Sequence, residues 1–514
     1  MKRRALEYVL PGDVTAPRLR AGLATDFDLE AEPSKVVDRA YFDTFDGLVR
    51  QADMSLVWEN GRLQLMNGDG REVACLSWPN APTVVRASDL PSGALRERLA
   101  PVIAVRAATA LVRVRVRQRV VRVLDAERKT VACVVIAQPS IVVGDRARRR
   151  LTPRLTVTGV QGYAKALGRV RDLVEHRLGL SGAGESLRDE AVARAGGIPG
   201  GMSSALEVAL QPRQRVDHAA VAILSQLIAA IEANLPGTLA DVDSEFLHDL
   251  RVAVRRTRSL QRELGGAFPQ ADLARFRAEF RWLQEITGPA RDLDVYLLDF
   301  EAFAASLAAP QRFDLEPLRA LLSERRRRER RRMARALRSQ HTHTLLAEWK
   351  RLVETLPELP DDDRPDAAGP IVDLAGGRIA AVYRQMLRRG ARIDDQSPPV
   401  ALHDLRKKGK ELRYLLEFFG GLFPKATVDP TVKALKSLQD TLGRFQDREV
   451  QAMMLRSLAQ ETAGRQNGAA ALMAMGVLVE RLTDQQAQAR AEFARRFASF
   501  ADRRRRTAMR ETFA

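Results

Sequence analysis

The sequence predicts an α+β domain at the N-terminus, followed by a larger all-α domain built from two similar halves. Strand patterns are concentrated in roughly the first 180 residues of the 514-residue chain. Helical periodicity dominates from about residue 215 onward, and one long helical pattern occurs there twice. We therefore expect two domains joined by a linker, with a duplication inside the larger one.

The composition is that of a folded, cationic protein. Hydrophobic residues make up 45% of the chain, which is enough for a sizeable core. Lys and Arg number 83 against 65 Asp and Glu, and the resulting net charge of +18 attracts anions. The two cysteines, Cys75 and Cys133, imply no disulfide framework and fit a reducing compartment. We find neither an apolar signal segment nor a run of about 20 apolar residues, so we expect a cytoplasmic protein that does not cross a membrane.

The N-terminal domain contains several predicted strands. Residues 112–117 alternate Val and Arg, which predicts a strand with one apolar and one basic face. Residues 131–136 and 155–157 indicate further strands. Asn60-Gly61 lies between two short apolar runs and predicts a tight hairpin turn.

A helix and a linker follow these strands. Residues 161–178 have a helical pattern that ends at Gly179, and glycine-rich runs come next. These boundaries assign residues 1–180 to the N-terminal domain and residues 181–204 to the linker.

The all-α domain, residues 205–514, divides at a Pro- and Asp-rich stretch near residues 356–370. We expect two halves, at about 205–355 and 371–514, with about four helices each. His248-Asp249-Leu250-Arg251 recurs as His403-Asp404-Leu405-Arg406, 155 residues later. The same offset relates Gly265-Gly266 to Gly420-Gly421, Phe268-Pro269 to Phe423-Pro424, and Leu283-Gln284 to Leu438-Gln439. A register kept over roughly 45 residues indicates a duplication, and such halves usually pack about a pseudo-two-fold axis.

The repeated helix has a cationic face opposite an apolar face. At about 100° per residue, Leu250, Val254 and Leu260 lie on one side of a helix over residues 246–264. The candidate anion-binding residues on the other side, in both copies, are His248, Arg251, Arg255, Arg258, Arg262, His403, Arg406, Lys407, Lys410 and Arg413. Like charges stacked in this way repel one another, and no acids are interleaved with them to offset the repulsion. Charge-assisted bonds to the phosphate oxygens of a polyanion would relieve that repulsion.

A charged helix face is more often a solvated surface than a binding site, but here the arrangement occurs twice. His248 and His403 occupy equivalent positions, which favours phosphate contact over a purely structural role. His341 and His343 make a weak case for a metal site. We therefore predict no metal ligands, no catalytic residues and no cofactor.

A second basic segment is the arginine run at residues 325–332, which continues to Arg335 and Arg338. We expect it on the third helix of the first half, matched by Arg490 in the second half. Arg328, Arg335 and Arg490 join the candidate anion-binding set, and other arginines of the run are expected to be merely solvated. Asp292 and Asp447 follow a glycine-containing break, where helix capping or the orientation of an arginine is favoured over catalysis.

The duplicated pattern His-x-x-Arg, followed by Leu-Gln-x-x-x-Gly-x-x-x-Asp, resembles the CHAD family, the conserved histidine α-helical domain. The resemblance covers about residues 215–510. It implies two pseudo-symmetric four-helix bundles around a basic groove that binds inorganic polyphosphate. The family also suggests association with polyphosphate granules.

The N-terminal domain is similar to a divergent CYTH domain, an antiparallel β-barrel with a triphosphate tunnel. Tyr41-Phe42-Asp43-Thr44 resembles the Tyr-Tyr-Asp-Thr element of that family. The resemblance also implies two acidic strands that hold a divalent metal, but here Glu7 stands alone and residues 154–158 replace the late Glu-x-Glu strand. A metal clamp of two carboxylates is therefore missing. The basic strand face formed by Arg113, Arg115 and Arg117 could hold phosphate weakly or could simply be solvated.

These observations favour a non-catalytic protein that binds inorganic polyphosphate. The first alternative is a metal-dependent triphosphatase of the CYTH type, which needs acidic ligands that the sequence lacks. The second is nucleic-acid binding, which the charge permits. Aromatic residues make up only 5% of the chain and do not interleave with the cationic faces, as base stacking would require.

Overall fold

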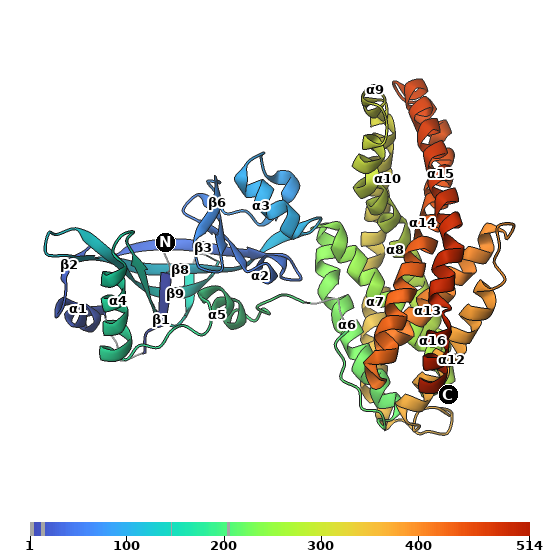
Figure 1. Ribbon diagram of the computed structural model, residues 1–514, viewed down its shortest axis with the longest axis horizontal. Coiled ribbons are helices and arrows are strands. Elements are labelled where there is room, and N and C mark those ends of the chain that lie inside the picture. The colour runs from blue at the N-terminus through green and yellow to red at the C-terminus, as the bar shows by residue number, and fades with distance from the viewer. Residues whose placement is uncertain (1–4, 12–15, 145, 203–205, 514) are drawn as a thin grey trace. The chain divides into compact units, whose positions relative to one another are not determined.

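The computed structural model describes residues 5–11, 16–144, 146–202 and 206–513. The chain forms two compact units, unit 1 (Met1–Ser204) and unit 2 (Ala205–Ala514), shown in Figure 1.

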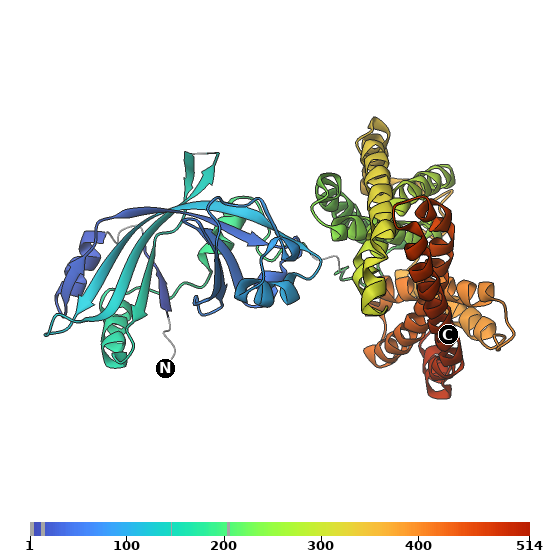
Figure 2. The same ribbon diagram turned by 90° about the horizontal axis from the view of Figure 1, so that it is seen from above.

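Unit 1 is built on one antiparallel sheet of 11 strands. The strands are β1 (Ala5–Val9), β2 (Asp28–Ala31), β3 (Lys35–Asp43), β4 (Met54–Glu59), β5 (Arg62–Asn67), β6 (Glu72–Ser77), β7 (Val84–Arg86), β8 (Ala107–Leu124), β9 (Thr130–Val143), β10 (Arg146–Arg150) and β11 (Arg154–Gly159). Their order is β1-β11-β9-β8-β3-β4-β5-β6, with β10 beside β9, and β2 and β7 beside β8. Figure 2 shows this sheet curled into a half-barrel. The two edge strands, β1 and β6, do not pair with each other in the described part of the unit, so the barrel is open.

The strand predictions are confirmed in detail. Val112, Val114 and Val116 of β8 are buried, whereas Arg113 and Arg117 are exposed. β4 and β5 form the predicted hairpin. Asn60 and Gly61 at its turn have φ angles of 49° and 79°, the left-handed backbone that tight hairpin turns require.

The helices of unit 1 are α1 (Ala16–Ala24), α2 (Leu48–Gln51), α3 (Ala94–Ile103), α4 (Ala164–Asp172), which continues as a π-helical turn over Leu173–Arg177, and α5 (Leu187–Arg194). Residues 181–204 were predicted to be a linker, and that prediction is wrong where α5 forms within them. Leu187, Ala191 and Val192 of α5 are buried in one cluster with Val114 of β8. The glycine-rich flanks concealed this short apolar helix face in the sequence.

Unit 2 is helical throughout. Its helices are α6 (Val216–Ala240), α7 (Ser244–Glu263), α8 (Gln270–Ala305), α9 (Ala309–Phe313), α10 (Glu316–Leu337), α11 (Gln340–Thr355), α12 (Ile371–Gly390), α13 (Pro399–Phe419), α14 (Lys425–Ala463), α15 (Gly468–Phe500) and α16 (Arg503–Thr512). The first residues of α6 and α12, of α7 and α13, and of α8 and α14 are each 155 residues apart. The structure therefore contains the duplication, although the described residues form six helices in the first half and five in the second, where we expected about four each.

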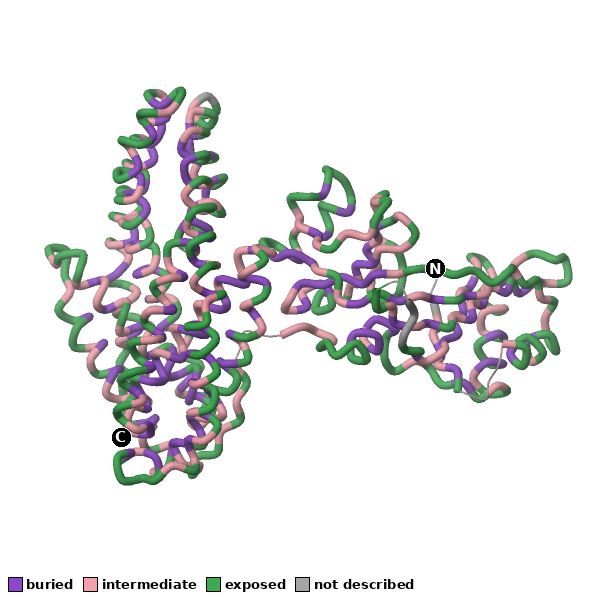
Figure 3. The backbone as a smooth tube through the Cα atoms, turned by 180° about the vertical axis from the view of Figure 1, so that it is seen from behind, coloured by how far each residue is buried: buried purple, intermediate pink, exposed green. Residues whose placement is uncertain are grey.

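Both halves share one hydrophobic core. Leu250 and Leu260 from α7 lie in the same cluster as Leu405 and Leu415 from α13. A second cluster joins α8, α10, α14 and α15 where they extend beyond the other helices (Figure 1). Figure 3 shows buried positions gathered where the helices face one another.

One described helix, α6, is long and apolar enough to cross a membrane, judged by length and composition alone. Polar side chains such as Gln226 and Glu232 interrupt this helix, so it is not an unbroken run of about 20 apolar residues. Ile223, Leu224 and Ile231 of this helix are buried in the shared core of unit 2, so α6 serves as a core helix there.

Candidate anion-binding groove

Helices α7 and α13 present the repeated motif, and both are fixed by local sequence. Asp243 caps α7, because its carboxylate accepts hydrogen bonds from the backbone N–H groups of Glu245 and Phe246. α13 starts with Pro399, whose fixed φ suits the first turn of a helix. Burial of the apolar face of each helix leaves the cationic face outside the core.

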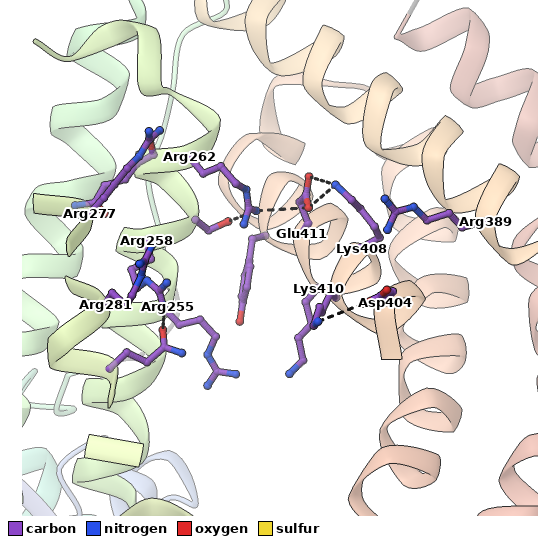
Figure 4. Close-up of a pocket in the computed structure, with 15 residues that line it drawn as sticks. Arg255, Arg258, Arg262, Arg277, Arg281, Arg389, Asp404, Lys408, Lys410 and Glu411 are labelled. Atoms are coloured by element: carbon purple, nitrogen blue, oxygen red, sulfur yellow. Dashed lines mark hydrogen bonds and ion pairs between the residues drawn. The ribbon is translucent and has the colours of Figure 1, made fainter. Parts of the chain in front are cut away.

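The two cationic faces border a groove with a cavity of about 690 Å³. Figure 4 shows side chains from both halves directed into the space between the helices. The lining residues are Arg255, Arg258, Ser259, Gln261, Arg262, Arg277, Arg281, Gln284, Arg389, Asp404, Lys407, Lys408, Lys410, Glu411 and Tyr414. Nine of these are cationic and two are carboxylates, so the groove is strongly positive.

Five of the candidates named from the sequence line this groove: Arg255, Arg258, Arg262, Lys407 and Lys410. Arg255 and Lys410 are equivalent in the duplication. Residues from both halves therefore line the groove.

A second group of candidates lies on α7 and α13 but does not line this cavity. Arg251 donates from Nη1 to the carbonyl oxygen of Gln284 at 2.8 Å and to Oγ1 of Thr287 at 2.9 Å. Its equivalent, Arg406, forms an ion pair with Asp447 at 3.3 Å. These contacts tie the cationic helices to α8 and α14.

The repeated glycines explain how these guanidinium groups approach α8 and α14. A Cβ on Gly288 would lie 3.6 Å from Nη1 of Arg251, and one on Gly443 would lie 4.0 Å from Nη2 of Arg406. α8 and α14 run unbroken through these glycines, so the predicted helix break is wrong and neither Asp292 nor Asp447 is a cap.

The two histidines have different surroundings. Nδ1 of His403 lies 2.5 Å from Oε1 of Gln446. His248 is half-buried, and desolvation together with the charge of Arg291 lowers its pKa below the usual value. His248 therefore favours the neutral form, which can donate only one hydrogen bond to an anion.

Arg413, Arg328, Arg335 and Arg490 also lie outside the lining of the cavity. Arg413 forms an ion pair with Glu417 at 2.7 Å. Arg490, on α15, donates to the carbonyl oxygens of residues 394, 395 and 397 and thereby holds the loop between α12 and α13.

The position predicted for the arginine run is also corrected. Arg328 and Arg335 are exposed on α10, which follows α6, α7, α8 and the short α9 and is therefore not the third helix of its half.

Sequence reasoning missed four cations of the groove: Arg277 and Arg281 on α8, Arg389 on α12, and Lys408 on α13. Arg277 and Arg281 are spaced i, i+4 and so share a helix face, a signal that was visible in the sequence. The position of Arg389 depends on how α12 packs, which no local pattern reveals.

Burial and mutual repulsion disfavour the charges of this region. Burial lowers the pKa of Lys410 to about 8, and the neighbouring Arg406 and Arg255 add to this shift. Burial likewise lowers the pKa of Arg251, and that of Arg258, where Arg281 contributes. An anion in the groove would offset both effects.

Some cations are already partly neutralised, contrary to the expectation of an acid-free face. Arg262 bonds to Glu263 at 2.7 Å and lies 3.8 Å from Glu411. Lys408 bonds to Glu411 at 2.9 Å. Arg255 and Lys410 form no ion pair with a described carboxylate, so unbalanced positive charge remains around them.

In unit 1, the carboxylate expected from the CYTH resemblance is engaged with a cation. Glu7 forms an ion pair with Arg154 at 3.1 Å, and the buried Arg154 also bonds to Glu190 of α5 at 2.8 Å. On the basic strand, Arg115 bonds to Asp38 at 2.7 Å. Among the described residues, no group of three or more His, Cys, Asp or Glu side chains is placed to hold a metal ion.

Comparisons with known proteins agree with the helical repeat. A family model described as the CHAD domain matches residues 222–456. The uncharacterized proteins Rv2226 and MT2285, from two strains of Mycobacterium tuberculosis, are each 28% identical over 228 residues, which is 43% of this chain and 42% of theirs. The match therefore spans less than half the length of these relatives.

Two solved structures are also similar to parts of the chain. The CHAD domain from the plant Ricinus communis has 28% sequence identity and a TM-score of 0.49, covering 58% of this chain and 96% of that chain. HpAC1 from Hippeastrum, for which a dominant triphosphatase activity is reported, has 15% identity and a TM-score of 0.24, covering 38% of this chain and 97% of that chain.

Proposed function

We propose that unit 2 binds inorganic polyphosphate in the groove between α7 and α13 without hydrolysing it, because residues 222–456 match the CHAD family model. CHAD domains are linked to polyphosphate binding in general. The observation that carries the proposal for this chain is the crowding of partly desolvated cations from both halves around Arg255 and Lys410.

The chemistry of the groove favours a bare phosphate chain over a nucleic acid. Arginine forks and lysine ammonium groups from opposite walls can bond to successive phosphate oxygens. Tyr414 is the single aromatic side chain among the described lining residues, and it is buried. The groove therefore offers no stacking platform for bases.

We propose that unit 1 is a non-catalytic scaffold. Hydrolysis of a phosphate chain needs a divalent metal held by several oxygen ligands. Glu7 forms an ion pair with Arg154, so its carboxylate is not free to bind a metal. The apolar side chains of α5 pack in one cluster with Val114 of the sheet. The free thiols of Cys75 and Cys133 support a cytoplasmic location for the protein, and we propose that it associates there with polyphosphate granules.

The test is a titration of the full chain with long-chain polyphosphate, repeated with DNA and RNA as competitors at equal phosphate concentration. We expect tight, salt-sensitive binding that the nucleic acids displace poorly. The Arg255→Gln/Lys410→Gln variant should bind polyphosphate at least about tenfold more weakly. Equal displacement by DNA, or unchanged affinity in that variant, would contradict the proposal.

A further inference from the structure

Helix α10 carries its arginines on two sides that differ in their partners. On the inner side, Arg326 bonds to Asp294 at 2.5 Å and to Asp241 at 2.8 Å. Arg330 is buried and lies 2.9 Å from Asp241. These arginines attach α10 to the rest of unit 2.

The outer side also carries Arg328, which pairs with Glu329 at 3.7 Å. The four arginines there without an ion pair, Arg327, Arg331, Arg332 and Arg335, are called the α10 arginine face. All four side chains are exposed. At about 100° per residue they fall within an arc of about 140°, and they extend along about 12 Å of the helix. Glu329 lies outside the arc, whereas Glu324, three residues before Arg327, lies within it and is paired with Arg465 at 2.6 Å. No described carboxylate forms an ion pair with any of the four.

This face is costly for the isolated protein. Like charges spaced i, i+4 destabilise a helix, and the two acids within reach, Glu324 and Glu329, are shared with Arg465 and Arg328. Core packing does not require them, because the buried residues of α10, such as Leu322 and Met333, lie on the other side. Two shared acids cannot balance four arginines, so the remaining counter-charge is expected from a ligand.

We propose that the α10 arginine face is a second, weaker site for phosphate chains, separate from the groove, which makes the affinity for polyphosphate depend on chain length. This inference rests on the proposed function of the groove. None of the four arginines lines the groove cavity. Their exposed guanidinium groups form charge-assisted bonds to phosphate oxygens but enclose nothing, so binding there is weak and salt-sensitive. A chain long enough to occupy both sites gains affinity through effective concentration, which a short chain does not.

The experiment compares two variants that remove equal charge. Arg327→Gln/Arg331→Gln/Arg332→Gln/Arg335→Gln neutralises the α10 arginine face. Arg503→Gln/Arg504→Gln/Arg506→Gln/Arg510→Gln neutralises four exposed arginines of α16 and serves as the control. Both are titrated as full chains with tripolyphosphate and with long-chain polyphosphate, after circular dichroism has confirmed equal helix content.

We expect the α10 variant to bind long-chain polyphosphate about tenfold or more weakly, with a shallower salt dependence, and tripolyphosphate with unchanged affinity. The α16 control should lose much less affinity for the long chain. Equal losses of affinity in both variants would show that the effect depends on net charge alone, and this would overturn the inference. So would an equal loss of affinity for tripolyphosphate and for the long chain.

The groove variant Arg255→Gln/Lys410→Gln separates this inference from the proposed function. If both hold, the groove variant loses affinity for tripolyphosphate and for the long chain. Full binding of both ligands by the groove variant would contradict the proposed function of the groove. If the α10 variant binds both ligands with unchanged affinity while the groove variant binds them more weakly, only the second site is contradicted.

Discussion

Nη2 of Arg256 on α7 lies 3.0 Å from Oε2 of Glu417 on α13, and this ion pair has a pseudo-symmetric counterpart. The 155-residue offset carries Arg256 onto Glu411 and Arg262 onto Glu417. The counterpart is therefore Arg262 with Glu411, at 3.8 Å. The first half supplies both cations and the second half both anions, so these two ion pairs join one half to the other.

This relationship predicts a rescue by charge exchange. Arg256→Glu places two carboxylates together in a half-buried contact, and we expect the free energy of unfolding to fall by about 2 kcal/mol. The double variant Arg256→Glu/Glu417→Arg restores this pair but removes the partner of Arg413, so it should recover part of the loss. Urea unfolding followed by far-UV circular dichroism measures this, because the helices lie mainly in unit 2. Additive losses in the double variant would contradict the pairing.

The duplication predicts that the two walls of the groove contribute similarly. Arg255→Gln and Lys410→Gln occupy equivalent positions, so each should weaken polyphosphate binding. Each should also reduce the slope of log affinity against log salt by about 1, because one fewer counterion is released. Titrations at several salt concentrations provide the measurement. A defect confined to one wall would show that the other is not used.

Lys410 predicts a pH dependence of binding. Its pKa is about 8, so it loses its charge as the pH rises, and affinity should fall between about pH 7 and pH 9. Lys410→Arg stays charged over this range and should remove the decline.

The stability of the free protein should respond to pH in the opposite direction. The folded pKa of Lys410, about 8, lies below its ordinary value of 10.5. Between these values the unfolded chain binds more protons, so the contribution of Lys410 to the free energy of unfolding increases as the pH rises. The difference between wild type and Lys410→Met in urea unfolding, measured at several pH values, checks this sign.

Neighbouring arginines of α10 should differ sharply in their effect on stability. Arg326→Gln leaves the buried Asp294 without its closest cation, and we expect a loss of about 3 kcal/mol. Arg327→Gln removes an exposed side chain and should change stability by less than about 0.5 kcal/mol. Thermal unfolding of both variants is the measurement, and similar losses would contradict the division of α10 into two sides.

Unit 1 should not release phosphate from tripolyphosphate or ATP with magnesium or manganese. The carboxylate of Glu7 is engaged with Arg154, and a hard cation needs several free oxygen ligands. Glu7→Ala should therefore leave the background rate unchanged. Robust turnover that disappears in Glu7→Ala would establish a triphosphatase instead.

Local sequence patterns predicted much of the architecture. The valine–arginine alternation predicted which side of β8 is buried, because side chains of a strand point alternately to opposite faces. The spacing of His248, Arg251 and Arg255 predicted a cationic helix face in the same way, through the helical period. Glycine-rich runs, in contrast, concealed α5, because its stability comes from burial of Leu187 and Val192 against the sheet rather than from its own sequence.

The sequence by itself determined the duplication and the cationic faces of α7 and α13. The tertiary structure alone decided which cations face one another. It brought Arg389 of α12 and Arg281 of α8 to the groove, and it left Arg328 and Arg335 on the outside of α10. The reason is physical: the helical period sets which side of a helix a residue occupies, but only packing between helices sets what that side meets.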